Sequence, residues 1–195
     1  MPQYTVVQDS SQLSSIKNFV FPAVCKTVEA CGSAESHHMG IVFHEKQLHQ
    51  FKYPLLVQEF YNHNATIFKV FVIGDFIHVV KRLSLPNLPK EHDVILFDSQ
   101  KPFDTQFTNV KRTSNKDDKQ LMEETPEPPR EALQIISKAI SDALGLTLFG
   151  FDLITQVETG QHAVIDINYF PTYGGVPNFE EVFLTYLVKR VKAQK

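Results

Sequence analysis

The sequence of 195 residues predicts an α+β fold in which hairpins and helices mix, not a regularly alternating doubly wound sheet. Residues 66–73 and 76–81 are apolar stretches joined by Gly74 and Asp75, a pair compatible with a tight hairpin turn. Residues 129–144 carry apolar side chains at helical spacing and are followed by a glycine, so they predict an amphipathic helix. The length suits one compact domain or two small lobes that share a cleft.

The remaining elements follow from similar local signals. We expect further helices over 9–18, 44–51 and 178–192, and further strands over 21–27, 40–43, 55–60, 146–156 and 161–170. Residues 99–129 differ, because they are polar and proline-containing and have little apolar periodicity. We interpret them as a mobile, partly ordered excursion, with a solvated surface loop as the plainer alternative.

Composition excludes several classes of protein. A formal net charge of −3 argues against general nucleic-acid binding, although a local cationic cleft for a small anionic ligand remains compatible with it. No apolar run approaches the ~20 residues of a membrane span, and the first residues do not resemble a signal peptide. Two cysteines do not make a disulfide framework, so we expect a cytoplasmic protein, and we also expect a monomer.

Two carboxylates in the segment 148–171 suggest a metal site. If its two strands fold into a hairpin about Thr159, Asp152 falls opposite Asp166 within about one residue of register, with the Cβ atoms ~5 Å apart when directly paired. Asn168 shares a face with Asp166 because strand side chains alternate. Two facing carboxylates repel each other, and these oxygen ligands suit Mg²⁺ far better than zinc. The alternative is that both face solvent, or that one pairs with a lysine.

Two lysines lie in otherwise apolar strands. Lys26 stands in 21–27 and Lys69 in 66–73, where a cation is costly unless an anion meets it. A polyphosphate would be a suitable partner for both lysines. Either one could instead be an exposed lysine on an edge strand. Gly32 and Ser33 lie in a polar loop that could bring backbone amides to a phosphate, but by themselves they are a weak signal.

These segments together resemble the inositol-tetrakisphosphate 1-kinase family. The resemblance runs from about Phe19 to Val191 and is carried by four motifs, which read FPAVCKT from Phe21, LVQEFYNHNATIFKVFVIG from Leu56, LFGFDLI from Leu148 and TGQHAVIDINYFP from Thr159. It implies an ATP-grasp fold with ATP between two α+β lobes, which we expect at 1–55 and 56–195. It also implies an enzyme that uses Mg-ATP to phosphorylate an inositol polyphosphate.

The resemblance assigns roles to individual residues. It implies catalytic roles for Lys26, Lys69 and Asp166, and magnesium ligands at Asp152, Asp166 and Asn168, for two ions. The nucleotide would contact Lys26, Gln58, Glu59, Phe60, Tyr61, Lys69, Ser84 and Ser99, with the adenine held largely by backbone groups of the strand end 58–61. The inositol phosphate would contact His37 or its neighbour His38, Lys69, Asn168 and Thr172. Further cations on the acceptor side could come from Lys81, Arg82, Lys101 and Arg112.

The sequence also departs from the family. The resemblance implies an additional N-terminal domain with nucleotide and inositol contacts, which is not found in this sequence, so we expect either a truncated form or a minimal kinase with an open inositol site. Thr172 stands where the resemblance implies a small glycine. A more open acceptor site could also admit a fully phosphorylated inositol and form a pyrophosphate. Two other functions remain open at this point, an ATP-grasp carboxylate–amine ligase and a non-catalytic module that binds a nucleotide or an inositol phosphate.

Overall fold

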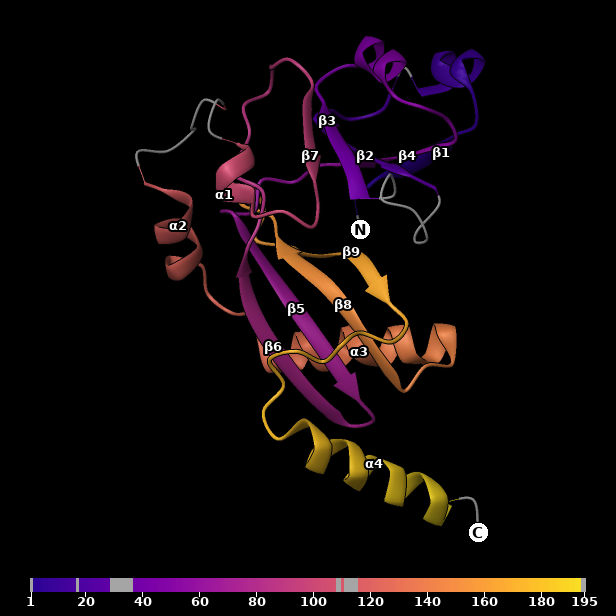
Figure 1. The fold of residues 1–195 in the computed structure, drawn as a ribbon, viewed down its shortest axis with the longest axis vertical. Helices are drawn as coiled ribbons and strands as arrows, with labels where there is room; N and C mark the ends of the chain where they lie inside the picture. Colours follow the sequence, from indigo (N-terminus) through magenta and orange to yellow (C-terminus); the bar gives the residue numbers. More distant parts are fainter. Residues whose placement is uncertain (1, 17, 29–36, 108–109, 111–115, 194–195) are drawn as a thin grey trace. The chain divides into compact units, whose positions relative to one another are not determined.

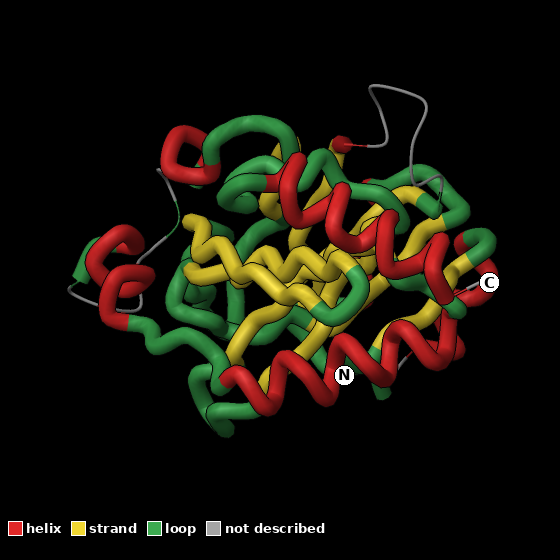
Figure 2. The backbone as a smooth tube through the Cα atoms, turned by 90° about the horizontal axis from the view of Figure 1, so that it is seen from below, coloured by secondary structure: helices red, strands yellow, loops and turns green. Residues whose placement is uncertain are grey.

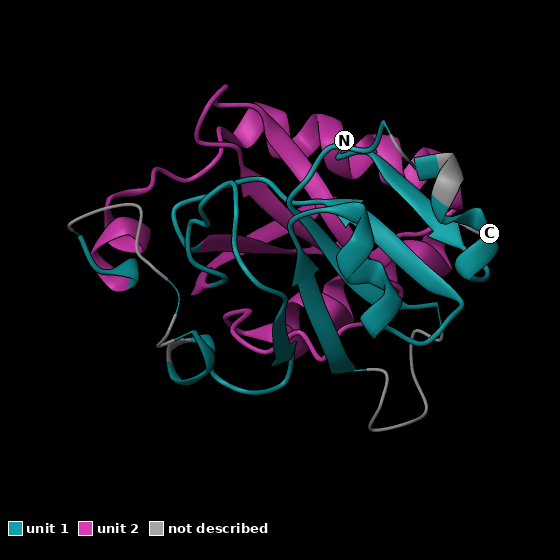
Figure 3. Cartoon of the chain, turned by 90° about the horizontal axis from the view of Figure 1, so that it is seen from above, with its two compact units in different colours: residues 1–65, 84–118 teal, residues 66–83, 119–195 magenta. Residues whose placement is uncertain are grey.

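The computed structural model describes residues 2–16, 18–28, 37–107, 110 and 116–193, which form two compact units (Figures 1 and 3). Unit 1 comprises Met1–Ala65 and Ser84–Asp118, and unit 2 comprises Thr66–Leu83 and Lys119–Lys195. The units interleave in sequence, because the chain leaves unit 1 for one hairpin and then returns to it. The expected lobes, 1–55 and 56–195, do not follow these compact units, and their role as functional lobes stays a prediction.

Unit 1 is built on a five-stranded antiparallel sheet with the order β1-β4-β2-β3-β7. Its elements are β1 (Tyr4–Val7), η1 (Ser10–Ile16), β2 (Ala23–Thr27), β3 (His38–Val42), η3 (Glu45–Gln50), β4 (Leu55–Glu59), β7 (Ile95–Asp98) and α1 (Phe103–Gln106). One face of the sheet packs on the 3-10 helices η1 and η3, through Cys25, Val57 and Leu48 among others. The other face packs on Phe60 and Leu88 and on the segment around Phe107.

Unit 2 is a four-stranded antiparallel sheet with the order β6-β5-β8-β9 and a long helix on each face (Figure 2). Its elements are β5 (Thr66–Ile73), β6 (Phe76–Leu83), α2 (Asp118–Glu124), α3 (Arg130–Leu144), β8 (Leu148–Thr155), β9 (His162–Asn168) and α4 (Phe179–Ala193). Helix α3 covers the face that carries Phe68 and Phe151. Helix α4 and the chain before it cover part of the opposite face, around Phe71.

Most of the elements predicted from the sequence are confirmed. The hairpins β5–β6 and β8–β9 form as expected, and α3 ends at Gly145, which takes the left-handed conformation with φ of 67°. The expected helices at 9–18 and 44–51 are instead short 3-10 helices. The described part of 99–129 is partly helical, since it holds α1 and α2. Among the described residues, no helix combines the length and apolar character that a membrane crossing requires.

Candidate functional site

A row of charged side chains crosses the sheet of unit 2. Lys69 on β5 pairs with Asp152 on β8, and Asp152 in turn lies directly opposite Asp166 on β9. Side chains of directly paired residues share a face of the sheet, and so do residues two apart on one strand. Lys69, Asp152, Asp166 and Asn168 therefore lie on one face. The predicted pairing of the two carboxylates is confirmed.

An irregularity in β9 creates this alignment. Asp152 pairs with Asp166 but the next residue, Leu153, pairs with Val164, so Ile165 is an extra residue in the ladder. Without this bulge Asp152 would lie opposite Ile165, and Asp166 would point to the face that α3 covers. Bulges commonly redirect a side chain in this way, often beside active sites. The carboxylate pair thus depends on one inserted residue.

The charges in this row are only partly balanced. The Lys69 Nζ atom lies 3.8 Å from Asp152 Oδ1, with the two side chains 30% and 15% exposed. Asn168 Nδ2 donates a hydrogen bond of 3.2 Å to Asp166 Oδ2. The alternative that a lysine pairs with one carboxylate thus also holds, because Lys69 does so. One ammonium group beside two facing carboxylates leaves the row net negative.

The donor set fits Mg²⁺ better than a transition metal. Within the described residues, no three His, Cys, Asp or Glu side chains gather as a metal cluster. Mg²⁺ needs no such cage, because it usually takes one or two carboxylates and completes its octahedron with waters and substrate phosphates. Asp152 and Asp166 supply two carboxylates, and the amide of Asn168 turns its nitrogen to Asp166, which leaves its oxygen available as a further hard ligand.

The chain that follows β9 folds back over the same face. A side chain at Gly150, which pairs with Asn168, would come within 3.1 Å of the ring of Pro171. Tyr173 anchors this return: it is 3% exposed and its ring packs against Phe71 and Phe179. Thr172, expected to contact the substrate, is exposed on this anchored loop.

Two of the expected acceptor-side cations lie on opposite faces of β6. Arg82 pairs with Ile67, which places it on the face of Lys69, and its Nη2 atom donates to the carbonyl of Gly174 at 3.4 Å. Lys81 lies on the α3 face, where its Nζ atom donates to the Thr125 carbonyl at 2.6 Å. Lys81 is therefore separated from the acidic row by the sheet, while Arg82 shares its face.

In unit 1, Lys26 and the strand end 58–61 are neighbours. Lys26 pairs with Leu56 and Val24 pairs with Gln58, so Lys26 and Gln58 lie on one face of the sheet, two residues apart along the ladder. The backbone amides of Glu59 and Phe60 donate to the carbonyls of Gln3 and Pro22, at 2.8 and 2.9 Å. These bonds hold the strand end to both of its neighbouring segments.

Ser84 is buried rather than displayed. Its side chain is 6% exposed, and its hydroxyl lies 3.1 Å from Nε2 of the equally buried His63. The other ring nitrogen, Nδ1, lies 2.6 Å from the carbonyl oxygen of Tyr61. His63 was not among the residues expected from the sequence. The sequence feature that could have pointed to it is its position between two asparagines, Asn62 and Asn64, ahead of an apolar strand.

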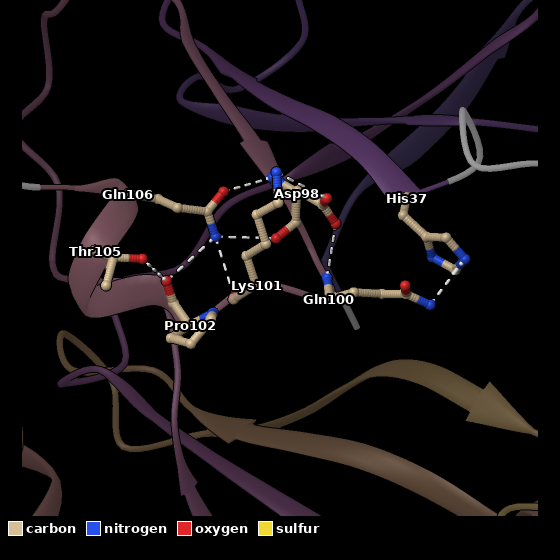
Figure 4. A network of polar contacts seen from close by, with 7 residues as sticks. All are labelled: His37, Asp98, Gln100, Lys101, Pro102, Thr105 and Gln106. Atoms are coloured by element: carbon tan, nitrogen blue, oxygen red, sulfur yellow. Dashed lines mark hydrogen bonds and ion pairs between the residues drawn. The ribbon is translucent and has the colours of Figure 1, made fainter.

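His37 and Ser99 come together at the other end of this sheet, where the Ser99 amide donates to the His37 carbonyl at 3.0 Å. His37 Nε2 lies 3.0 Å from the side-chain amide nitrogen of Gln100 (Figure 4). The backbone amide of Gln100 holds the pKa of Asp98 below its ordinary value, and the nearby ammonium of Lys101 acts in the same direction. Arg112 and the pair Gly32–Ser33 lie outside the described residues.

The structure therefore gathers the expected residues into three groups without testing their roles. Unit 2 brings together Lys69, Asp152, Asp166 and Asn168, with Thr172 on the returning loop. Unit 1 holds one group around Lys26 and the strand end 58–61, with Ser84 beyond it, and another made of His37 and Ser99. All of these roles stay predictions.

Comparisons with known proteins agree on one family. Residues 1–189 match the family model described as the inositol 1,3,4-trisphosphate 5/6-kinase ATP-grasp domain. Inositol-tetrakisphosphate 1-kinase 1 of Arabidopsis thaliana is 35% identical over 194 residues, which are 95% of this chain and 60% of that protein. The inositol-tetrakisphosphate 1-kinase of Xenopus laevis is 39% identical over 184 residues, which are 92% of this chain and 45% of that protein. The chain thus spans about half the length of these curated relatives.

Solved structures support the fold independently. A structure of the ATP-grasp ligase PsnB complexed with a minimal precursor, Mg and ADP superposes with a TM-score of 0.58 at 14% identity, over 97% of this chain and 53% of that one. N5-carboxyaminoimidazole synthetase from Staphylococcus aureus, complexed with ADP, gives a TM-score of 0.52 at 13% identity, over 92% and 43%. Identities this low support the fold alone. Taken with the family match, they show that this chain has the α+β ATP-grasp fold and belongs to the family of the inositol 1,3,4-trisphosphate 5/6-kinase ATP-grasp domain.

Proposed function

We propose that this chain carries a Mg-ATP-dependent kinase that transfers the γ-phosphoryl group of ATP to a hydroxyl of an inositol polyphosphate. The observation that carries the proposal is the row Lys69–Asp152–Asp166 on one face of the unit 2 sheet, in a chain of this family. A triphosphate and a divalent cation would complement this row, because the phosphates meet the lysine and the cation meets the carboxylates.

Each group has a role in this mechanism. Asp152, Asp166 and Asn168 would hold the magnesium, two ions in our proposal. Bound Mg²⁺ would supply neutralisation of the charge on the triphosphate oxygens, which lowers the barrier to in-line transfer. Lys69 lies beside Asp152 and would neutralise phosphate oxygens, with Lys26 in the same role from unit 1. Transfer breaks the bond between the γ-phosphorus and the bridging oxygen and forms one to the acceptor oxygen, whose proton is released.

The remaining contacts position the two substrates. The adenine would lie against the strand end Gln58–Tyr61, whose amides at Glu59 and Phe60 are already held by the sheet. Ser99 would support the nucleotide directly, and Ser84 would do so only through the buried histidine that its hydroxyl binds. The acceptor would be held by His37, Asn168, Thr172 and Lys69, with Arg82 as an additional cation on the face of the acidic row. The names of the relatives favour inositol tris- or tetrakisphosphates as acceptors.

One variant tests the metal assignment. Asp166→Asn removes one of two facing carboxylates, so we expect phosphorylation of the acceptor to fall at least about a hundredfold. The apo protein should unfold at no lower denaturant concentration, because the substitution relieves the repulsion from Asp152. The matched control is Asp142→Asn, an exposed carboxylate on α3 that pairs with Lys138. Near-normal activity of Asp166→Asn would defeat the assignment.

The substrate class needs its own assay. The protein is incubated with Mg-ATP and inositol phosphates of increasing phosphate number, and the products are resolved by ion exchange. We expect a single added phosphate on acceptors that keep a free hydroxyl. Transfer to fully phosphorylated inositol would instead indicate pyrophosphate formation. ADP release that needs a carboxylate and an amine would contradict the kinase and identify a ligase.

We further propose a cytoplasmic monomer. The thiol of Cys25 is free, as in a reducing compartment; it is 1% exposed, and burial raises its pKa to about 12, which makes it unreactive. Its position in the core of unit 1 is that of a small apolar side chain.

A further inference from the structure

The two crossings between the units are joined on the unit 1 side by a network of polar side chains. The chain leaves unit 1 after Ala65 and returns at Ser84, and the Ser84 amide donates to the Ala65 carbonyl at 2.7 Å. Asn87 Oδ1 accepts from the backbone amides of His63 and Asn64, and Asn87 Nδ2 donates to Asn64 Oδ1. Every one of these bonds joins the outgoing segment to the returning one.

His63 lies at the centre of this network in a defined tautomer. The Tyr61 carbonyl can only accept a hydrogen bond, so His63 Nδ1 carries the proton and donates across 2.6 Å. Its Nε2 atom therefore accepts from the Ser84 hydroxyl, 3.1 Å away. Burial of the ring lowers its pKa to about 4, so this neutral tautomer persists throughout the physiological pH range.

The backbone around His63 is strained. Asn64 and Ala65 follow it with φ of 52° and 51°, a left-handed conformation that non-glycine residues seldom adopt twice in succession. Each such residue costs of the order of 1 kcal/mol and persists only where its surroundings hold it. The bonds from Asn87 to this segment provide that hold. Strain of this kind concentrates at functional sites. The carbonyl that His63 binds, beside this strained segment, belongs to Tyr61.

That residue, Tyr61, lies just past the end of β4. The sheet holds the amides of Glu59 and Phe60, but the strand ends at Glu59. Phe60 is buried with its ring against that of His63, with ring centroids 5.5 Å apart. Beyond it, the bond from His63 orients the carbonyl, and hence the peptide plane, of Tyr61.

We infer that His63 is a positioning residue for the nucleotide, which orients the peptide that follows Tyr61 and ties it to the Ser84 hydroxyl. This inference rests on the proposed function in taking the strand end 58–61 as the adenine site. It also gives Ser84 a different role from the one that the family resemblance implies, because its hydroxyl supports His63 rather than the nucleotide. The probe for both statements is Mg-ATP itself.

Three variants separate the two hydrogen bonds of His63. His63→Leu removes both, and we expect the Kd for Mg-ATP and the KM for ATP to rise about tenfold, with kcat and the KM for the acceptor within about threefold of wild type. His63→Asn keeps a donor at the position of Nδ1 and should restore most of the ATP affinity. Ser84→Ala should weaken ATP binding in the wild-type background and have no further effect in His63→Leu.

Controls distinguish positioning from general destabilisation. His49→Gln changes an exposed histidine of the same unit and should alter neither the Kd for Mg-ATP nor the KM for ATP. A purely structural role for His63 would lower kcat and both affinities in proportion to the loss of stability, and would overturn the inference. If His63→Leu fails to fold, the test of Ser84→Ala in the His63→Leu background no longer applies. A tenfold weaker ATP affinity of His63→Asn, which keeps the donor at the position of Nδ1, then overturns the inference instead.

The outcomes also separate this inference from the proposed function. Titration calorimetry with Mg-ATP needs no acceptor, so it reports on His63 even if the wild type phosphorylates no inositol phosphate. Normal phosphorylation together with unchanged ATP affinity in His63→Leu would overturn the inference and leave the proposed function intact. Absence of Mg-ATP binding by the wild type would overturn both.

Discussion

At the residue scale, the candidate metal site shows what strand alternation can and cannot predict. The spacing of Asp152 and Asp166 about a central turn predicted that they would face each other to within one residue. Whether they did so depended on that one residue, because a register shifted by a single position would have sent Asp166 to the α3 face. The bulge at Ile165 decides the register, and no local pattern in an isoleucine-rich strand indicates where a bulge will form.

A buried histidine makes the stability of unit 1 depend on pH. Burial lowers the pKa of His63 from 6.5 to about 4, while its hydrogen bond to Tyr61 acts weakly in the opposite direction. Between these values the unfolded chain binds more protons than the folded one, so stability falls as the pH falls from 6.5 toward 4. The full effect is about 3 kcal/mol. Phe60, Tyr61 and Ser84 surround the ring with neutral groups.

Urea unfolding at a series of pH values measures this effect. The contribution of His63 to the free energy of unfolding should be constant above pH 6.5 and should decline below it. In His63→Asn this part of the slope should disappear, because an asparagine does not titrate. His49→Gln, which changes an exposed histidine, should keep the wild-type slope. A His63→Asn protein with an unchanged slope would show that other groups cause the acid sensitivity.

At the element scale, the hairpins and α3 were predictable because their signals are local. The β5–β6 turn and the amphipathic stripe of α3 each lie within a short window of sequence. Strand order and the interleaving of the units are set by contacts between distant segments, which no window contains. The 3-10 geometry of η1 and η3 was missed for a related reason, since polar starts and short lengths are common to both types of helix.

The tip of the β5–β6 hairpin is a point where an element depends on one glycine. Gly74 has φ of 59°, and a Cβ atom there would lie 2.8 Å from the ring of Tyr186 on α4. The ring cannot easily yield, because its hydroxyl is held by Thr147 Oγ1 at 2.6 Å. We expect Gly74→Ala to lower the free energy of unfolding by about 1–3 kcal/mol more than the conformational cost alone.

A second glycine isolates that packing cost. Gly160 has φ of 68°, close to that of Gly74, but a Cβ atom there would have no atom within 4 Å among the described residues. Gly160→Ala therefore carries the conformational cost without the clash. Chemical denaturation of both variants gives the difference between them. Equal losses of unfolding free energy in Gly74→Ala and Gly160→Ala would show that α4 does not press on the hairpin tip.

At the scale of the whole molecule, the proposed function requires an acidic protein to bind two polyanions. The net charge is −3, a sum that already includes the two facing carboxylates of the candidate site, so long-range attraction cannot come from the protein as a whole. It must come from local cations on the face of the acidic row, with Lys69 and Arg82 the described examples in unit 2. Composition was compatible with a local cationic cleft, but only the strand register shows which side of the sheet each cation takes.

Salt dependence tests whether these cations attract the acceptor. Exposed charges are screened over about 10 Å at 0.1 M salt, so the KM for the inositol phosphate should rise several-fold between about 50 and about 300 mM KCl. Arg82→Met should raise this KM at low salt and flatten its salt dependence, because an exposed cation on the face of the acidic row is lost. Lys138→Met is the control. It removes a similarly exposed cation from α3, on the opposite side of the sheet and paired with Asp142, and should change neither the KM for the inositol phosphate nor its salt dependence.

A salt dependence equally flattened by both substitutions would mean that the acceptor responds to overall charge, and that the local arrangement on this face does not govern its binding.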